Sequence, residues 1–171
     1  AVLVLGSPQQ RSIHPQQDLQ TAIEQTAHTL TPCLDTCAQC GITLALEPLS
    51  PIETDLFTTA CDSCEFVRMV NHPALKLHLD VKAMASEKMS MNDIIIGCGD
   101  ELAHFHANDP NRLGPGMGAV DYAPISDALK TIGYNGWLSV EVFDLTPGAE
   151  TIAEQSIAYL RRYFGLSHTR R

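Results

Sequence analysis

Four residues of types that bind divalent metals stand at the ends of four short strand-like segments of this chain. They are Glu47, Asp80, His106 and Glu141, which end segments 42–47, 75–80, 103–106 and 137–141. Side chains alternate between the two faces of a strand, and in every segment one face is apolar while the other holds the terminal residue. We therefore predict strands of one sheet whose apolar faces pack against helices and whose other faces bring the four residues together.

Helical segments are expected between these strands, and the order of the elements determines the predicted fold. The helices are expected near 16–39, 56–71, 91–98, 122–132 and 148–164, and a further strand, 2–6, opens the chain. Strands that alternate with helices indicate βα units around a parallel sheet, in which the carboxyl ends of the strands share one edge. The predicted fold class is therefore α/β, a partial (β/α)8 TIM barrel of about five βα units.

The length of the chain limits how much of such a barrel it holds. A complete barrel usually has about 250 residues, whereas this chain has 171 and begins on a strand without an initiator Met. We expect residues 1–166 to be the carboxyl-terminal part of a longer barrel and residues 167–171 to be a flexible tail. Because unpaired edge strands favour association, we also predict that the chain associates with itself.

Carboxylates and imidazoles that converge without a thiolate are typical of one class of metal site. This ligand set favours one divalent ion such as Mn²⁺, Mg²⁺ or Co²⁺, with Zn²⁺ as a further candidate. His78 and His104 lie two residues before Asp80 and His106, on the same faces of their strands. We expect these two histidines to orient the ligands or to fill the floor of the barrel rather than to bind the metal.

The charge and hydropathy of the chain disfavour two classes of partner. Its net charge is −9, with no stripe of Lys and Arg, whereas binding to nucleic acid depends on neutralising phosphates. No apolar run approaches the roughly 18 residues that span a bilayer, and no signal peptide is visible. The expected partner is therefore a small molecule rather than a nucleic acid or a membrane, with a cytoplasmic location as the default.

The six cysteines include two closely spaced groups that could suggest a metal cluster. Cys33, Cys37 and Cys40 share one face of an expected helix, and Cys61 and Cys64 stand near the start of another. A cluster-binding loop would instead follow a strand, and no matching pair of histidines accompanies Cys61 and Cys64. We interpret the cysteines as free thiols that behave as small buried apolar residues.

Several longer stretches resemble the xylose isomerase-like superfamily, in particular its sugar-phosphate isomerase/epimerase and ketose 3-epimerase branch. They are VLVLGSPQQR (2–11), GITLALEPL (41–49), HPALKLHLD (72–80), HFHANDPNR (104–112), GPGMGAVDY (114–122) and IGYNGWLSVE (132–141). The resemblance covers nearly the whole chain. It implies the barrel from its fourth to its eighth strand and one metal ion held by the four residues named first.

The resemblance also implies roles for individual residues. Glu47 and Glu141 correspond to the pair that binds the metal and moves a proton on and off the substrate carbon through a cis-enediolate. Glu53 and Arg112 match positions that hold the oxygens of the substrate. One position departs from the pattern, because many members have a His three residues after the metal-binding Asp, where this chain has Ala83. The identity of the substrate is therefore not implied.

These observations lead to a main functional hypothesis and three alternatives. The main hypothesis is a metal-dependent isomerase or epimerase that acts on a sugar or a sugar phosphate. An apurinic-endonuclease-like hydrolase on the same barrel would need more metal ligands and a basic face, and the sequence shows neither. A polyol dehydratase shares the metal chemistry and stays open, as does an inactive fragment that keeps the metal site.

Overall fold

The computed structural model describes residues 1–165, so the tail predicted at 167–171 lies outside the described residues. The structure has one sheet of five parallel strands, ordered β1-β2-β3-β4-β5 along both the sheet and the sequence. The strands are β1 (Val2–Leu5), β2 (Thr43–Leu46), β3 (Leu75–Asp80), β4 (Leu102–Ala107) and β5 (Leu138–Val140). Together with their helices they form part of a barrel, which confirms the predicted α/β class and the count of five βα units.

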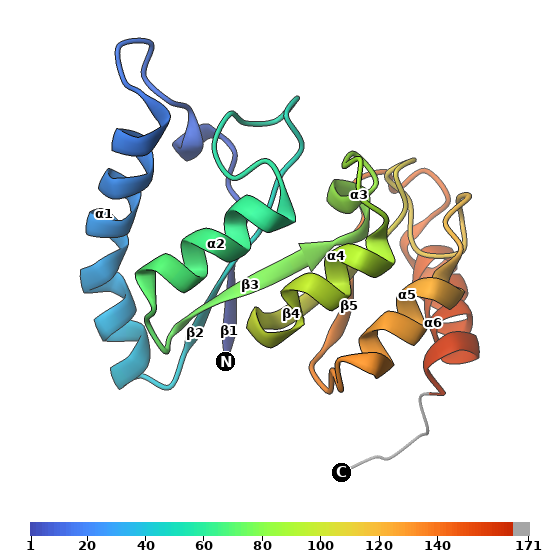
Figure 1. The fold of residues 1–171 in the computed structure, drawn as a ribbon. Coiled ribbons are helices and arrows are strands. Elements are labelled where there is room, and N and C mark those ends of the chain that lie inside the picture. Colours follow the sequence, from blue (N-terminus) through green and yellow to red (C-terminus); the bar gives the residue numbers. More distant parts are fainter. Residues whose placement is uncertain (166–171) are drawn as a thin grey trace.

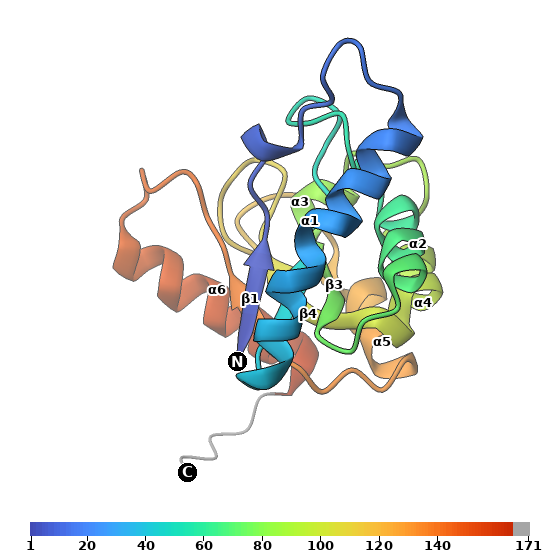
Figure 2. The same ribbon diagram turned by 90° about the vertical axis from the view of Figure 1, so that its left-hand side faces the viewer.

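The long helices occupy the segments in which they were predicted, with differences at the ends. They are α1 (Leu19–Gln39), α2 (Ala60–Val70), α4 (Met91–Cys98), α5 (Tyr122–Thr131) and α6 (Ala149–Phe164). Helices α1, α2, α4 and α5 lie along one side of the curved sheet (Figure 1), and α6 continues this layer next to α5 and packs against the same core through Leu160 (Figure 2). The sheet therefore has a covered outer face and an open inner face.

Local capping explains where several helices begin and end. The side chains of Asp18, Thr59, Ser90 and Asp121 accept hydrogen bonds from backbone N–H groups in the first turns of α1, α2, α4 and α5. Such caps satisfy N–H groups that have no partner within the helix. Asn71 ends α2 in the left-handed conformation, which Asn adopts more readily than most residues.

A four-residue helix, α3 (Val81–Met84), was not predicted from the sequence. It follows β3 without a loop, because the Asp80 carboxylate accepts a hydrogen bond from the N–H of Ala83 at 2.8 Å and so caps the new helix. Two short 3-10 turns, Gln9–Arg11 and Gly99–Glu101, were likewise not predicted. Segments of three or four residues are too short for hydrophobic periodicity to reveal them.

The apolar face of the central strands forms the core against the helices. Leu77, Leu79 and Phe105 are fully buried and pack in one cluster with residues of α2, α4 and α5. Burial of a side chain of this size stabilises the fold by roughly 1.5–3 kcal/mol. The prediction holds less well at the edge of the sheet, where Leu138 is half-buried and Val140 is 37% exposed.

Strands β1 and β5 are the two edges of the sheet within residues 1–165. Val2, Leu3 and Val4 of β1 are exposed, as is Val140 of β5. Apolar side chains on unpaired edges are the feature on which the prediction of self-association was based. That association stays a prediction.

The cysteine interpretation is correct in one respect and wrong in another. All six are free, and Cys64 and Cys98 are buried as small apolar residues. Cys33, Cys40 and Cys61 are exposed, so the expectation of burial is wrong for them, while Cys37 of α1 is half-buried and packs against the core. Among residues 1–165, no helix combines the length and the apolar character that crossing a bilayer requires.

Candidate active site

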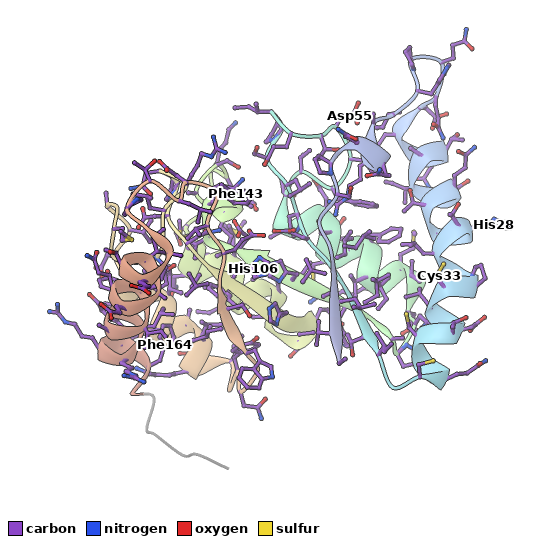
Figure 3. The ribbon with its side chains drawn as sticks, turned by 180° about the vertical axis from the view of Figure 1, so that it is seen from behind. His28, Cys33, Asp55, His106, Phe143 and Phe164 are labelled. Carbon is purple, nitrogen blue, oxygen red and sulfur yellow. The ribbon has the colours of Figure 1, made fainter. Side chains whose placement is uncertain are left out.

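The four residues predicted to bind metal stand at the carboxyl ends of β2, β3, β4 and β5. Glu47 and Glu141 directly follow β2 and β5, Asp80 ends β3, and His106 is the last residue but one of β4. The parallel register places Asp80 beside His106 and His106 beside Ser139. His106 lies near the middle of the open face (Figure 3). The topology thus brings together residues that are up to 94 positions apart.

Glu47 is almost completely buried, with 7% of its surface exposed. A Cβ atom at Gly6 would collide with its carboxylate, so the glycine lets the Glu47 side chain take its present position beside the end of β1. The buried side chain of Arg11 donates hydrogen bonds to the carbonyl oxygens of Leu5 and Glu47, which ties the ends of β1 and β2 together. Arg11 therefore places one positive charge behind the glutamate.

Burial and neighbouring negative charge disfavour the ionised form of Glu47. Its burial, followed by the charges of Asp80 and Glu141, raises the pKa of Glu47 to about 8, although His106 and Arg11 oppose the shift. A carboxyl group with such a pKa is partly protonated at neutral pH. A cation among these carboxylates would favour the ionised form.

Asp80 is held rigidly by two hydrogen bonds. One carboxylate oxygen accepts from the N–H of Ala83 at 2.8 Å, and the other accepts from the Asn108 side-chain amide at 2.6 Å. Asn108 is itself fixed, because its side-chain oxygen accepts from the N–H of Lys82 and its carbonyl oxygen accepts from the Tyr122 hydroxyl. Burial raises the pKa of Asp80, and the two hydrogen bonds partly oppose this effect.

His106 connects the buried carboxylates to Glu141. Its Nδ1 atom is 3.3 Å from Glu141 Oε2, 3.8 Å from Asp80 Oδ2 and 4.0 Å from Glu47 Oε1. Burial works against the charged imidazole, but Glu141, Glu47 and Asp80 together raise the pKa of His106. The contact with His106 in turn lowers the pKa of Glu141, whose side chain is 34% exposed and is the most accessible of the four.

The structure adds His78 to this group. One ligand atom from each of Glu47, His78, Asp80 and His106 lies within 4.8 Å of the others, and this compact set does not include Glu141. His78 is fully buried, and burial followed by the neighbouring imidazoles of His106 and His104 lowers the pKa of His78 to about 2. The ring is therefore neutral at physiological pH.

The donor set fits a divalent cation. Two atoms that bind one ion at about 2.1 Å lie between about 3.0 Å apart, at right angles, and about 4.2 Å apart, on opposite sides. The distances from His106 Nδ1 to the three carboxylates fall within this range. The three carboxylates around this imidazole repel one another, and a positive ion between them would relieve that repulsion.

Glu53 and Arg112, which were predicted to hold substrate oxygens, are linked to the site through Lys82, whose charge acts on Glu141, and through Phe143. Glu53 pairs with Lys82 at 3.0 Å and also accepts hydrogen bonds from the N–H and hydroxyl of Ser50. Lys82 and Arg112 lie 5.4 and 5.9 Å from the centre of the Phe143 ring, which is 47% exposed. In Figure 3 Phe143 lies near His106 on the same face.

Ala83, which stands where many relatives of the resembled branch have His, is buried; its N–H donates to the Asp80 carboxylate and its carbonyl oxygen accepts from Ser86. The nearby Lys82 amine points to Glu53 and Phe143 instead. A cation and an aromatic ring thus stand in a region where an imidazole was the expected group.

Sequence reasoning missed Gly6, Arg11 and Asn108 as parts of the site. Gly6 and Arg11 lie within a stretch that resembles the family, yet a lone Gly or Arg is common in loops that take no part in any site. Asn108 follows His106 by two residues on the same strand face, so the alternation rule that located the histidines could have located it too.

A comparison with known protein families identifies the fold at the level of sequence. The model of the xylose isomerase-like TIM barrel family matches residues 2–163. The chain belongs to this family. The resemblance inferred from the separate stretches is thereby confirmed, from the first strand to the last helix.

Curated relatives in the family are named as ketose 3-epimerases. The chain is 33% identical to a D-psicose 3-epimerase of Ruminiclostridium cellulolyticum over 120 aligned residues. The alignment covers 70% of this chain and 41% of the relative. The chain is 36% identical over 108 residues to a D-psicose 3-epimerase of Agrobacterium fabrum, covering 63% of the chain and 37% of the relative. The chain therefore spans about two-fifths of the length of these relatives.

Solved structures of D-psicose 3-epimerases also resemble this chain. The fold superposes on a D-psicose 3-epimerase crystallised in the presence of D-fructose with a TM-score of 0.82 and 28% identity, covering 90% of this chain and 61% of the other. It superposes on the Clostridium cellulolyticum D-psicose 3-epimerase with D-tagatose with a TM-score of 0.79 and 27% identity, covering 89% and 60%. Both of these solved structures are epimerases, and this chain shares their fold over about nine-tenths of its own length.

Proposed function

We propose that this chain carries the metal and proton-transfer site of a sugar epimerase that acts beside the carbonyl carbon of a ketose. The observation that supports this proposal most strongly is the convergence of Glu47, Asp80, His106 and Glu141 at the carboxyl edge of a family barrel. The named relatives act on ketoses, and the arrangement found here suits the same chemistry.

The metal would be held by Glu47, Asp80 and His106, with Glu141 as the fourth ligand. A bound divalent cation would polarise the carbonyl and hydroxyl oxygens of the sugar and make the adjacent carbon more acidic. Asp80, fixed by Ala83 and Asn108, has no freedom to move and serves to bind. The ligand set is compatible with Mn²⁺, Mg²⁺, Co²⁺ or Zn²⁺.

Glu47 and Glu141 would carry the proton. Their environments push their pKa values apart, because Glu47 is raised to about 8 by burial while Glu141 is lowered by its contact with His106. Two carboxyl groups with different proton affinities suit a reaction in which one accepts a proton and the other returns one. The more accessible Glu141 would accept the proton from one face of the substrate carbon, and Glu47 would return a proton to the opposite face.

The residues linked to the site through Lys82 and Phe143 suit a polyhydroxylated substrate. Glu53 offers carboxylate oxygens to hydroxyl groups, and Arg112 offers donors to hydroxyl or phosphate oxygens. Phe143 presents an exposed ring on which the apolar side of a sugar could lie. Because Lys82 and Arg112 both flank this ring, a sugar phosphate stays as well supported as a free sugar.

The other functions considered receive less support. An apurinic endonuclease on this barrel would act on DNA, but the net charge is −9. A polyol dehydratase could use the same metal and the same proton transfer, and its product would differ. An inactive fragment would keep the metal but catalyse no exchange of the proton.

The proposal is tested with Glu141→Gln, which preserves shape and weak coordination but cannot accept a proton. The chain, supplied with Mn²⁺, is incubated with D-psicose, D-fructose, L-ribulose and their phosphates in deuterium oxide. We expect the original chain to incorporate deuterium beside the carbonyl and Glu141→Gln to lose at least about a hundredfold of that rate.

A matched control is Glu150→Gln, a charge change at the start of α6, which should leave the rate unaltered. Loss of water from the sugar in place of epimer formation would favour the dehydratase. Undiminished deuterium incorporation in Glu141→Gln would remove Glu141 from the proton transfer.

A further inference from the structure

His78 is a buried polar group without a polar partner. Its side chain is completely inaccessible, and neither ring nitrogen has a hydrogen bond within the described residues 1–165. An unpaired buried polar group costs about 1–3 kcal/mol, and an apolar residue would fit the same interior without this cost. The position therefore needs an explanation beyond packing.

The ring is placed between the other imidazoles and the carboxylates. Its centre is 4.1 Å from that of His106 and 5.3 Å from that of His104. His78 Nε2 lies 3.6 Å from Glu47 Oε1, which is too long for a good hydrogen bond. It matches the separation, between about 3.0 and 4.2 Å, of two atoms that share one ion at about 2.1 Å.

We infer that His78 is a further metal ligand, so that the cation of the proposed function is bound by two imidazoles, His78 and His106, in addition to Glu47, Asp80 and Glu141. The inference rests on the metal site of that proposed function and extends it. A second nitrogen donor changes the selectivity of the site, because imidazole favours Zn²⁺, Co²⁺ and Ni²⁺ whereas Mg²⁺ prefers oxygen ligands and water. The site should therefore select the former ions over Mg²⁺.

His104 has the same type of ring in the same layer but a different role. Its Nε2 atom pairs with the hydroxyl of Ser139 at 3.0 Å. His104 forms a compact set with His78 and His106, but this set contains no carboxylate, and His104 is not part of the set that does. Its ring is partly exposed rather than sealed. His104 is therefore the natural control for His78.

The nitrogen count is measured first on the unaltered chain. X-ray absorption of the chain loaded with one Zn²⁺ reports the number of coordinated imidazoles from their multiple scattering. Two imidazoles would support the inference, and one would overturn it. This measurement needs no variant, so it decides the question even where a substitution at position 78 prevents folding.

The selectivity is measured next, by competition binding of Zn²⁺ and Mg²⁺ to the chain, His78→Phe and His104→Phe. We expect His78→Phe to weaken Zn²⁺ binding at least about tenfold and Mg²⁺ binding by less than threefold, and His104→Phe to change neither. An unchanged ratio of the two affinities in His78→Phe, or an equal loss in both variants, would contradict the inference.

The outcomes separate this inference from the proposed function. Absence of any Zn²⁺, Mn²⁺ or Mg²⁺ binding would remove the metal site altogether and both conclusions with it. Binding of metal by a single imidazole, with deuterium exchange intact, would leave the proposed function standing and remove only the role of His78.

Discussion

The two faces of the sheet have opposite properties, although their residues alternate along the same strands. On the outer face of β3, Leu77 and Leu79 are buried in a cluster with residues from helices α2 to α6. On the inner face of the same strand, His78 and Asp80 are equally buried but are polar and titratable. Burial alone therefore does not distinguish the core from the site.

What distinguishes the faces is whether the buried groups are satisfied. The outer face holds apolar atoms, which gain from leaving water. The inner face holds His78 without hydrogen bonds and Glu47 with a raised pKa, both of which cost free energy in the metal-free chain. The favourable burial of apolar groups on the outer face thus offsets the unfavourable burial of polar groups on the inner face, which are held in position for binding.

The largest effect is expected from a cavity in the outer face. Phe105 lies between His104 and His106 in sequence but points into the core. Phe105→Ala should lower the free energy of unfolding by about 3–5 kcal/mol, measured by urea denaturation. Metal affinity of the molecules that stay folded should fall by less than about threefold, and a larger loss would show that the two faces are not independent.

The converse change is Glu47→Gln on the inner face. The folded-state pKa of Glu47, about 8, lies above the ordinary value near 4.5, so its charge destabilises the metal-free fold increasingly as the pH rises between these values. Glu47→Gln should raise the stability of the metal-free chain by about 1–3 kcal/mol at pH 9 with little change at pH 4. Metal affinity should fall by about a hundredfold, and a chain destabilised at pH 9 would contradict the comparison.

The same raised pKa predicts how metal binding depends on pH. A ligand carboxylate must lose its proton to bind, so affinity should rise with pH up to about 8, by at most about tenfold per pH unit for one proton. Asp80, whose pKa is also raised, and His106 add to the slope at lower pH. The charges of Glu141 and Arg11 also act on Glu47, in opposite directions. Isothermal titration from pH 5.5 to 9 measures this, and in Glu47→Gln the slope above pH 7 should flatten.

The sequence predicted the parts of this architecture that repeat along the chain. Alternation along β2, β3 and β4 located Glu47, Asp80 and His106, because every second residue of each strand points to the inner face. Contacts between separate segments have no such period. Alternation could have placed Asn108 on the inner face, but its hydrogen bond to Asp80 could not be predicted, since that bond depends on the register of β3 against β4, which includes an irregularity between Leu77 and His78.

Gly6 shows the same limit, and it gives the smallest and most specific test. It binds nothing, yet a Cβ at this position would meet the end of the Glu47 side chain. Gly6→Ala should therefore displace the carboxylate without altering any ligand, and the flexible side chain should limit the loss of metal affinity to about three- to tenfold. The free energy of unfolding should change by less than about 1 kcal/mol.

The control is Gly97→Ala, since a Cβ there meets no atom within 4 Å. In the double variant Gly6→Ala/Glu47→Gln, the effect of Gly6→Ala on affinity should shrink, because it acts through Glu47. Additive losses in the double variant would mean that Gly6 influences the site by another route. In that case the effect of Gly6 on metal affinity would not pass through Glu47. The ligands of the inner face could then not be treated as one set positioned around Glu47, whereas the packing of the outer face would still be independent of metal binding.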